Sequence, residues 1–166
     1  NAIYEKDFLG FSYGFRPGRG QHDALDALAV GISSRNVNWI LDADVSKFFD
    51  TVNHDWLMQF VAHRINDPRI LRLIQKWLKA GVMDAGEYQE TNEGTPQGAV
   101  ISPLLANVYL HYVFDLWAHQ WRVRHATGKV TMVRYADDIV VGFQYQKDAE
   151  RFEAAMRERL HSFGLE

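Results

Sequence analysis

Residues 130–143 have the sequence VTMVRYADDIVVGF, and this stretch largely decides which fold the chain can adopt. Its two flanks, Val130 to Arg134 and Ile139 to Phe143, are rich in the β-branched and aromatic residues that favour strands. Between the flanks lies a short polar segment of the kind that closes a hairpin. The stretch therefore predicts two antiparallel strands joined by a tight turn.

The predicted turn carries two adjacent aspartates, Asp137 and Asp138, directly after Tyr135 and Ala136. Neighbouring carboxylates repel each other, so a stable fold needs either a compensating cation or wide exposure to water. A divalent metal ion is one such cation. A solvated Asp-Asp turn is the common alternative for this pattern, and the stretch alone leaves both interpretations open.

A second acidic strand is expected upstream, at residues 39–45, whose sequence is WILDADV. Asp42 and Asp44 lie two residues apart and therefore share one face of such a strand. Acidic residues are uncommon in strands, and burying one is costly unless it is paired or metal-bound. If this strand lies beside the 130–143 hairpin, Asp44 can converge with the aspartate pair. The alternative is that Asp42, Asp44 and Asp50 merely mark a strand end, and the strand alone does not choose between Asp42 and Asp44.

The third informative segment is GTPQGAVISP at residues 94–103, which a long apolar run follows. Ser102 before Pro103 predicts a helix start, because the hydroxyl can cap free N–H groups and proline suits the first helical turn. Gln97 and Gly98 would then form a loop in which an amide and a bare backbone approach a flat or charged ligand. A tight structural turn is the alternative.

Taken in this order, the three segments resemble the reverse transcriptase family, and most closely its group II intron-encoded members. Residues 135–138 are similar to the family's signature box, and residues 44–50 to its first catalytic segment. Residues 95–105 are similar to the block that sets the intron-encoded branch apart, and YGFRPGR at residues 13–19 to a further upstream block. The resemblance spans roughly residues 8–166, with Ala99 as a small departure where many relatives have a second glycine.

The resemblance implies an α+β fold, the right-hand polymerase palm, in which helices back an antiparallel sheet, together with part of the fingers. Residues 1–35 would be the partial fingers segment and residues 36–166 the palm with its catalytic carboxylates. The chain is therefore expected to be a fragment of a larger protein, with little or no activity on its own.

A catalytic site is implied as well, with Asp44, Asp137 and Asp138 as its metal ligands and the backbone carbonyl of Val45 as a further oxygen donor. Hard oxygen ligands, in a chain without cysteine, point to Mg²⁺, with Mn²⁺ as a substitute. Two such ions would support an in-line displacement at phosphorus.

Several substrate contacts follow from the same resemblance. Phe49 aligns with an aromatic gate that excludes the 2′-hydroxyl of ribonucleotides, although Phe48 and Phe49 could both be core residues, and for Phe48 a core position is expected. Gln97 and Gly98 resemble residues that line the nucleotide site. Nucleic-acid contacts are expected from three residues, with a solvated loop as the alternative for the two arginines: Arg16, Arg19 and Tyr135.

The implied function is RNA-directed DNA polymerisation. Its partners would be an RNA template, a DNA primer and dNTPs, with group II intron RNA as a further partner. One alternative is an RNA-binding maturase that assists intron splicing. Another is a related palm enzyme, such as an RNA-dependent RNA polymerase or a nucleotidyl cyclase, but Tyr135 and Phe49 argue against these.

Composition is compatible with this interpretation but does not lead to it. The 166 residues can bury one core, and they include no cysteine and no apolar run long enough to span a membrane, which predicts a soluble cytoplasmic protein. A formal charge of -3 is unusual for a nucleic-acid binder. Basic segments outside the chain would explain it.

Hydrophobic periodicity and turn residues also predict where the other elements lie. Asn53 is expected to cap one helix, and Asp67-Pro68 to start the next. Pro103 to about Arg122 is apolar nearly all round and should be a buried helix. The predicted elements are helices at 21–34, 54–65, 68–80, 103–122 and 147–163, strands at 39–45 and 130–143, and a short strand or hairpin at 83–91.

His111, Asp115 and His119 share one face of the long predicted helix, at intervals of four residues. The two histidines would be about 12 Å apart along the axis, which is too far for all three side chains to reach one zinc ion. A polar stripe that meets a neighbouring element is therefore the favoured interpretation.

Overall fold

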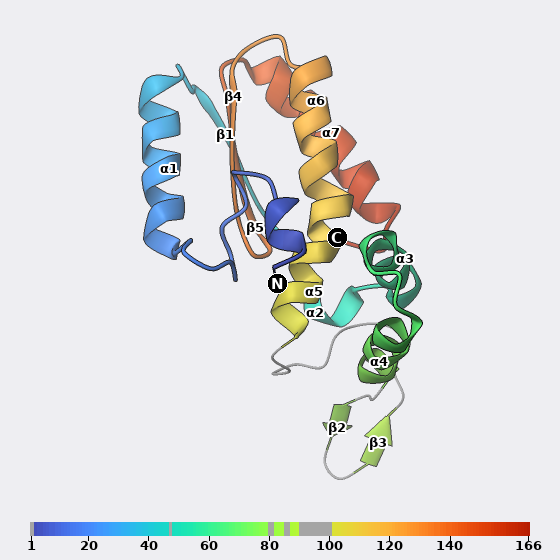
Figure 1. Ribbon diagram of the computed structural model, residues 1–166. Helices are drawn as coiled ribbons and strands as arrows, with labels where there is room; N and C mark the ends of the chain where they lie inside the picture. Colours follow the sequence, from blue (N-terminus) through green and yellow to red (C-terminus); the bar gives the residue numbers. More distant parts are fainter. Residues whose placement is uncertain (1, 47, 80–81, 85–86, 90–100) are drawn as a thin grey trace.

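The computed structural model describes residues 2–46, 48–79, 82–84, 87–89 and 101–166 (Figure 1). The predicted Gln97 and Gly98 contacts lie outside these residues. Among the described residues, no helix combines the length and apolar character needed to cross a membrane.

A three-stranded antiparallel sheet forms the centre of the fold. Its strands are β1 (Trp39–Asp44), β4 (Val130–Tyr135) and β5 (Asp138–Phe143), in the order β1-β5-β4. The predicted hairpin is therefore confirmed, and the strand predicted upstream lies directly beside it. In the register of β1 and β5, Trp39 faces Phe143 at one end and Asp44 faces Asp138 at the other.

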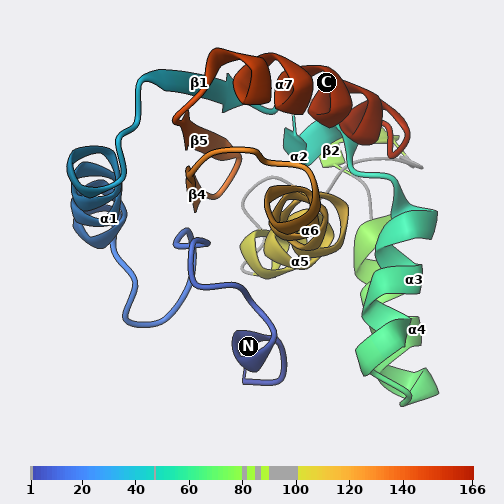
Figure 2. The same ribbon diagram turned by 90° about the horizontal axis from the view of Figure 1, so that it is seen from above.

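One face of the sheet packs on a long helical column. The side chains of Ile139, Val141 and Phe143 point into this core, because alternate residues of a strand share a face. The column consists of α5 (Ser102–Leu110), the π-helical turn η2 (His111–Asp115) and α6 (Leu116–Arg124), and α7 (Gln146–His161) packs beside it and on β1 (Figure 2).

The opposite face of the sheet is only partly covered. Helix α1 (Gln21–Ser34) lies against β4, and Gly31 is required there because a Cβ would overlap the Thr131 side chain. On the edge strand β1, Ile40 keeps 57% of its surface exposed. This face of the sheet is therefore open on the side where Asp42 and Asp44 lie.

The remaining elements are η1 (Tyr4–Lys6), α2 (Phe48–Thr51), α3 (His54–Arg64), α4 (Pro68–Lys79) and the hairpin of β2 (Val82–Asp84) and β3 (Glu87–Gln89). Among them, α3 packs on α5, and α4 packs on α3. The predicted cap of α3 is confirmed, since Asn53 Oδ1 accepts a hydrogen bond of 3.1 Å from the Trp56 backbone nitrogen. Together the helices and the antiparallel sheet form the expected α+β fold.

The structure differs from the sequence prediction at both ends of α5. The helix begins at Ser102 with Ile101 as its N-cap, so Ser102 is the first helical residue rather than the predicted cap. The single helix expected over 103–122 contains the π-helical turn η2. A π turn leaves carbonyls outside the regular α-helical pattern, and Arg159 of α7 donates to two of them, Tyr112 O at 3.2 Å and Val113 O at 2.9 Å.

Candidate active site

The backbone places the three predicted aspartates at the same end of the sheet. Asp44 is the last residue of β1 and faces Asp138, the first residue of β5. Directly opposed residues in antiparallel strands have Cα atoms about 4.5–5.5 Å apart and side chains on the same face. Asp137 precedes Asp138 in the turn, so the fold gathers all three residues at the open edge.

These carboxylates lie close enough to repel one another. The pKa of Asp138 is raised above its ordinary value of 3.8, first by burial and then by repulsion from Asp137, Asp44 and Asp42. Among the described residues, no three Asp, Glu, His or Cys side chains already stand together as metal ligands. The oxygen-only donor set and its excess charge nevertheless fit a hard divalent cation such as Mg²⁺.

The raised pKa of Asp138 predicts how this residue affects stability. In EDTA at pH 7, we expect Asp138→Asn to raise the melting temperature slightly, on the order of 1 °C. The effect is small because the residue is buried only in part and water still screens most of its charge. The ionised carboxylate costs stability above its raised folded pKa. Below the ordinary value of 3.8 both folded and unfolded states are protonated, so the difference disappears. Thermal melts from pH 3 to pH 8 measure the effect, and a lower melting temperature for the variant at pH 7 would contradict it.

The turn before the aspartates has an unusual backbone. Ala136 has a φ of 56°, in the left-handed region that costs a non-glycine residue about 1–2 kcal/mol. Gly14 lies against it so closely that a Cβ on Gly14 would overlap the Ala136 backbone nitrogen. Strained backbone that the surroundings hold in place is frequent at functional sites.

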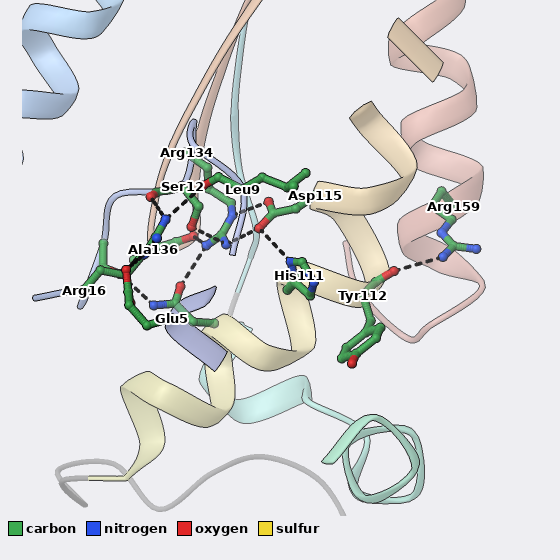
Figure 3. A network of polar contacts seen from close by, with 12 residues as sticks. Glu5, Leu9, Ser12, Arg16, His111, Tyr112, Asp115, Arg134, Ala136 and Arg159 are labelled. Atoms are coloured by element: carbon green, nitrogen blue, oxygen red, sulfur yellow. Dashed lines mark hydrogen bonds and ion pairs between the residues drawn. The ribbon is translucent and has the colours of Figure 1, made fainter. Parts of the chain in front are cut away.

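Arg134 supports this turn from inside the protein (Figure 3). It follows Val130 and Met132 on the core face of β4, is fully buried, and donates to the Ala136 carbonyl at 2.8 Å. Its ion pair with Asp115 is 2.6 Å long. Sequence reasoning missed Arg134, although an arginine at an inward position of an alternating strand was a visible signal.

The polar stripe on the helical column meets β4, as favoured from the sequence. Asp115 pairs with Arg134, and His111 Nδ1 lies 3.9 Å from Asp115 Oδ2. Burial is the main reason that the pKa of His111 is lowered, so its imidazole is neutral. His119 instead lies 3.0 Å from Arg122. His111 and Asp115 therefore lie near each other, whereas His119 contacts Arg122.

Arg16 is not on the surface. Only 8% of the residue is exposed, which excludes the solvated loop considered for it. Its guanidinium forms a 2.6 Å ion pair with Glu5 and donates to the carbonyls of Leu9 and Ser12 at 2.9 and 2.6 Å. A phosphate contact by Arg16 stays a prediction, but it would require these internal bonds to break.

Arg19 is half-buried and more accessible than Arg16. It donates to Gly10 O at 2.6 Å, and its guanidinium lies 5.1 Å from the centre of the Tyr13 ring. Tyr135 is the last residue of β4 and faces Asp138 across the hairpin. Nucleic-acid contacts by Arg19 and Tyr135 stay predictions, and both residues are partly exposed.

The segment after Asp44 contains two neighbouring phenylalanines that differ in burial. Val45 and Phe48 are buried in the core, which confirms the expectation for Phe48. Phe49 is only partly buried and packs edge-on against Phe48, with ring centres 5.5 Å apart. The gate role of Phe49 and the metal contact by the Val45 carbonyl are not tested by this geometry.

A cleft of about 730 Å³ lies between β1 and α7 and reaches Asp42 and Asp44. Its charged lining is mainly acidic and includes Glu153 and Glu158 from α7, with Arg157 as a basic member. Such a lining would repel a triphosphate, so we do not assign the nucleotide site to this cleft.

A sheet that carries opposed aspartates at one end and helices on its other face defines the palm of a right-hand polymerase. Telomerase from Candida albicans shares the fold, with a TM-score of 0.71 at 13% identity over 98% of this chain and 32% of that one. Apo telomerase from Candida Tropicalis gives a TM-score of 0.70 at 11% identity, over 99% of this chain and 33% of that one. At these identities the likeness establishes the fold alone.

Sequence comparison identifies the family of right-hand polymerases to which the chain belongs. The family model described as "Reverse transcriptase (RNA-dependent DNA polymerase)" matches residues 1–166, and the chain belongs to the reverse transcriptase family. Protein YkfC of Escherichia coli is 40% identical over 80% of this chain and 35% of its own length. Group II intron-encoded protein LtrA of Lactococcus lactis is 40% identical over 66% of this chain and 18% of its own. The chain thus spans about a third or less of these relatives.

Proposed function

We propose that the protein is an RNA-directed DNA polymerase of the group II intron type. It would extend a primer 3′-hydroxyl with deoxynucleotides on an RNA template. The observation that supports the proposal is the register of β1 and β5, because it pairs Asp44 with Asp138, which directly follows Asp137, in a member of the reverse transcriptase family. A cytoplasmic location, suggested by the lack of cysteine, is part of the same proposal.

Asp44, Asp137 and Asp138 would hold two Mg²⁺ ions, with Mn²⁺ as a substitute and the Val45 carbonyl as a further donor. Bound there, the ions would supply the Lewis acidity that activates the primer hydroxyl and offsets charge on the departing pyrophosphate. The pKa of Asp138 is raised first by burial and then by repulsion from its acidic neighbours, and the repulsion supports this assignment, since a cation would relieve it.

The template and primer would approach along the open face of the sheet. Asp42 and Asp44 are exposed there on β1, and helix α1 covers only the β4 side. Tyr135 and Arg19 would then contact the nucleic acid, and Gln97 and Gly98 the nucleotide. Arg16 would act through its bonds to Glu5, Leu9 and Ser12 unless binding releases it. The division into fingers, residues 1–35, and palm, residues 36–166, belongs to the same proposal.

Primer extension by the full-length natural protein tests the proposed function. Wild type should extend a DNA primer on an RNA template with dNTPs and Mg²⁺, and Asp137→Asn/Asp138→Asn should not. A DNA template and rNTPs in parallel reactions separate reverse transcription from other palm chemistry. Equal extension by wild type and the double variant would refute the proposal.

Maturase activity is a second candidate, favoured by the similarity to an intron-encoded protein. The same double variant separates the two functions, because RNA binding does not require the metal ligands. Splicing of the cognate intron RNA that persists in Asp137→Asn/Asp138→Asn while extension is lost would establish both activities. Splicing that no protein concentration stimulates would exclude the maturase role.

The proposed gate at Phe49 gives a prediction about sugar selection. We expect Phe49→Ala to lower discrimination between dNTPs and rNTPs by about 10–100-fold, because removing the ring removes a steric barrier to the 2′-hydroxyl. Steady-state kcat/KM for dCTP and rCTP on one template–primer measures the ratio. Unchanged discrimination in an active variant would show that Phe49 is not the gate.

A further inference from the structure

We propose that Arg134 is a positioning residue whose buried hydrogen bonds hold the Ala136-Asp137-Asp138 turn in its metal-binding shape. The inference rests on the proposed function, since it assumes that Asp137 and Asp138 bind the metal ions. It concerns a residue whose side chain lies beneath the site, on the core face of β4, and touches no substrate.

The Arg134 guanidinium uses each of its five N–H donors. Nε and one Nη2 hydrogen meet the two oxygens of Asp115 at 2.7 and 2.6 Å, and the other Nη2 hydrogen meets Ser12 Oγ at 2.8 Å. Nη1 donates to Asn107 Oδ1 at 3.0 Å and to Ala136 O at 2.8 Å. Because these five bonds reach four different residues around the guanidinium, they fix the orientation of its plane.

The bond to Ala136 connects this fixed group to the site. Ala136 has the left-handed φ and directly precedes Asp137, so the orientation of its carbonyl sets the direction in which the chain enters the aspartates. A neutral acceptor held by a charged donor is a strong hydrogen bond, particularly in a buried setting. Arg134 therefore stabilises the left-handed backbone conformation of Ala136, which an alanine does not normally adopt.

Residues 11–14 hold the same turn through a second set of contacts. Ser12 forms a parallel bridge with Arg134, flanked by backbone bonds of 2.8 Å from Tyr13 N to Arg134 O and from Arg134 N to Phe11 O. Asn107 joins both sides, because its Oδ1 accepts from Arg134 and its Nδ2 donates to Gly14 O at 2.6 Å. The turn is thus held between this segment and Arg134.

The cost of burial argues for a geometric role. Arg134 and Asp115 are both 0% exposed, and a buried ion pair is often no more stabilising than well-packed apolar side chains. Asp115 lies in the π-helical turn, a rare conformation that is frequent at functional sites. Stability alone therefore does not require the Arg134–Asp115 ion pair. Its place beneath the strained turn is explained if the pair fixes the position of the aspartates.

The test compares metal binding with protein stability in the full-length protein. Mn²⁺ binding is followed by the EPR signal of the free ion, in wild type, Arg134→Lys and Asp137→Asn/Asp138→Asn. Binding that wild type shows and the double variant lacks is assigned to the proposed site. Lysine keeps the positive charge beside Asp115 but lacks the planar five-donor fork. Arg157→Gln is the matched control, because it removes an exposed arginine whose ion pair, within the described part of the chain, is with Glu153 of the same helix.

For Arg134→Lys we expect Mn²⁺ affinity at the site to fall about 10-fold and kcat for primer extension to fall about 10–100-fold. KM for the template–primer should stay within about twofold, since no nucleic-acid contact is changed. Arg157→Gln should behave as wild type. Mn²⁺ affinity and kcat that stay within about twofold for Arg134→Lys, whatever happens to its melting temperature, would overturn the positioning role.

Gly14→Ala decides the question if Arg134→Lys does not fold, since its new Cβ presses on the Ala136 nitrogen while every side chain of the network remains. The same loss of Mn²⁺ affinity is expected, and unchanged affinity would overturn the inference. If the double variant itself binds Mn²⁺ like wild type, the proposed metal site fails, which is a separate outcome from failure of the Arg134 role.

Discussion

Asp44→Asn is expected to lower kcat for primer extension by at least about 10³-fold, equivalent to about 4 kcal/mol of transition-state stabilisation. An amide keeps the size of the side chain but removes the charge that would hold a divalent ion opposite Asp138. Little covalent chemistry is required of the protein in nucleotidyl transfer, so losing a metal ligand removes most of the catalysis. Single-turnover extension on an RNA template measures the effect.

Asp42→Asn is the matched control for this variant. Asp42 lies on the same strand and the same face, two residues before Asp44, but it faces Val140 rather than an aspartate. We expect it to retain extension within about threefold of wild type, because loss of a nearby exposed charge changes the local potential only slightly. If Asp42→Asn were the inactive variant and Asp44→Asn the active one, the assignment of the strand's functional residue would be wrong.

Phe152→Ala is expected to destabilise the fold by about 3–5 kcal/mol, the range for removing a large buried aromatic side chain. Phe152 of α7 is fully buried and contacts Phe143 of β5 and Trp121 of α6, with ring centres 5.4 and 5.0 Å away. Its ring therefore joins the sheet to two helices. The melting temperature should fall on the order of 10 °C.

Val123→Ala provides the comparison for Phe152→Ala. Val123 is on α6 near Trp121, but 70% of its surface is exposed, so shortening it should change stability by less than about 0.5 kcal/mol. Thermal melts followed by tryptophan fluorescence suit both variants, because Trp117 and Trp121 lie against Phe152. A small shift for Phe152→Ala would mean that α7 is not part of the cooperative core.

The secondary structure could largely be predicted because its signals are local. Alternation and β-branched residues identified β4, β5 and β1, and Asn53 correctly marked the start of α3. The π-helical turn could not be predicted, since its carbonyls are satisfied by Arg159, which is 46 and 47 positions away. A helical pattern in the sequence does not reveal such a distant donor.

The candidate site likewise combines features with local sequence signals and features that depend on contacts between distant residues. Residue types and their spacing indicated Asp137, Asp138 and one of Asp42 and Asp44, because carboxylates at strand ends and turns suit a metal ion. The resemblance to the reverse transcriptase family then singled out Asp44, and its metal role stays a prediction. The location of Arg16 was not predictable, since Glu5 and two carbonyls enclose it only when the loop folds back. Arg134 meets Ser12 across 122 positions of the chain. A buried charge needs partners in three dimensions, and folding alone determines which residues they are.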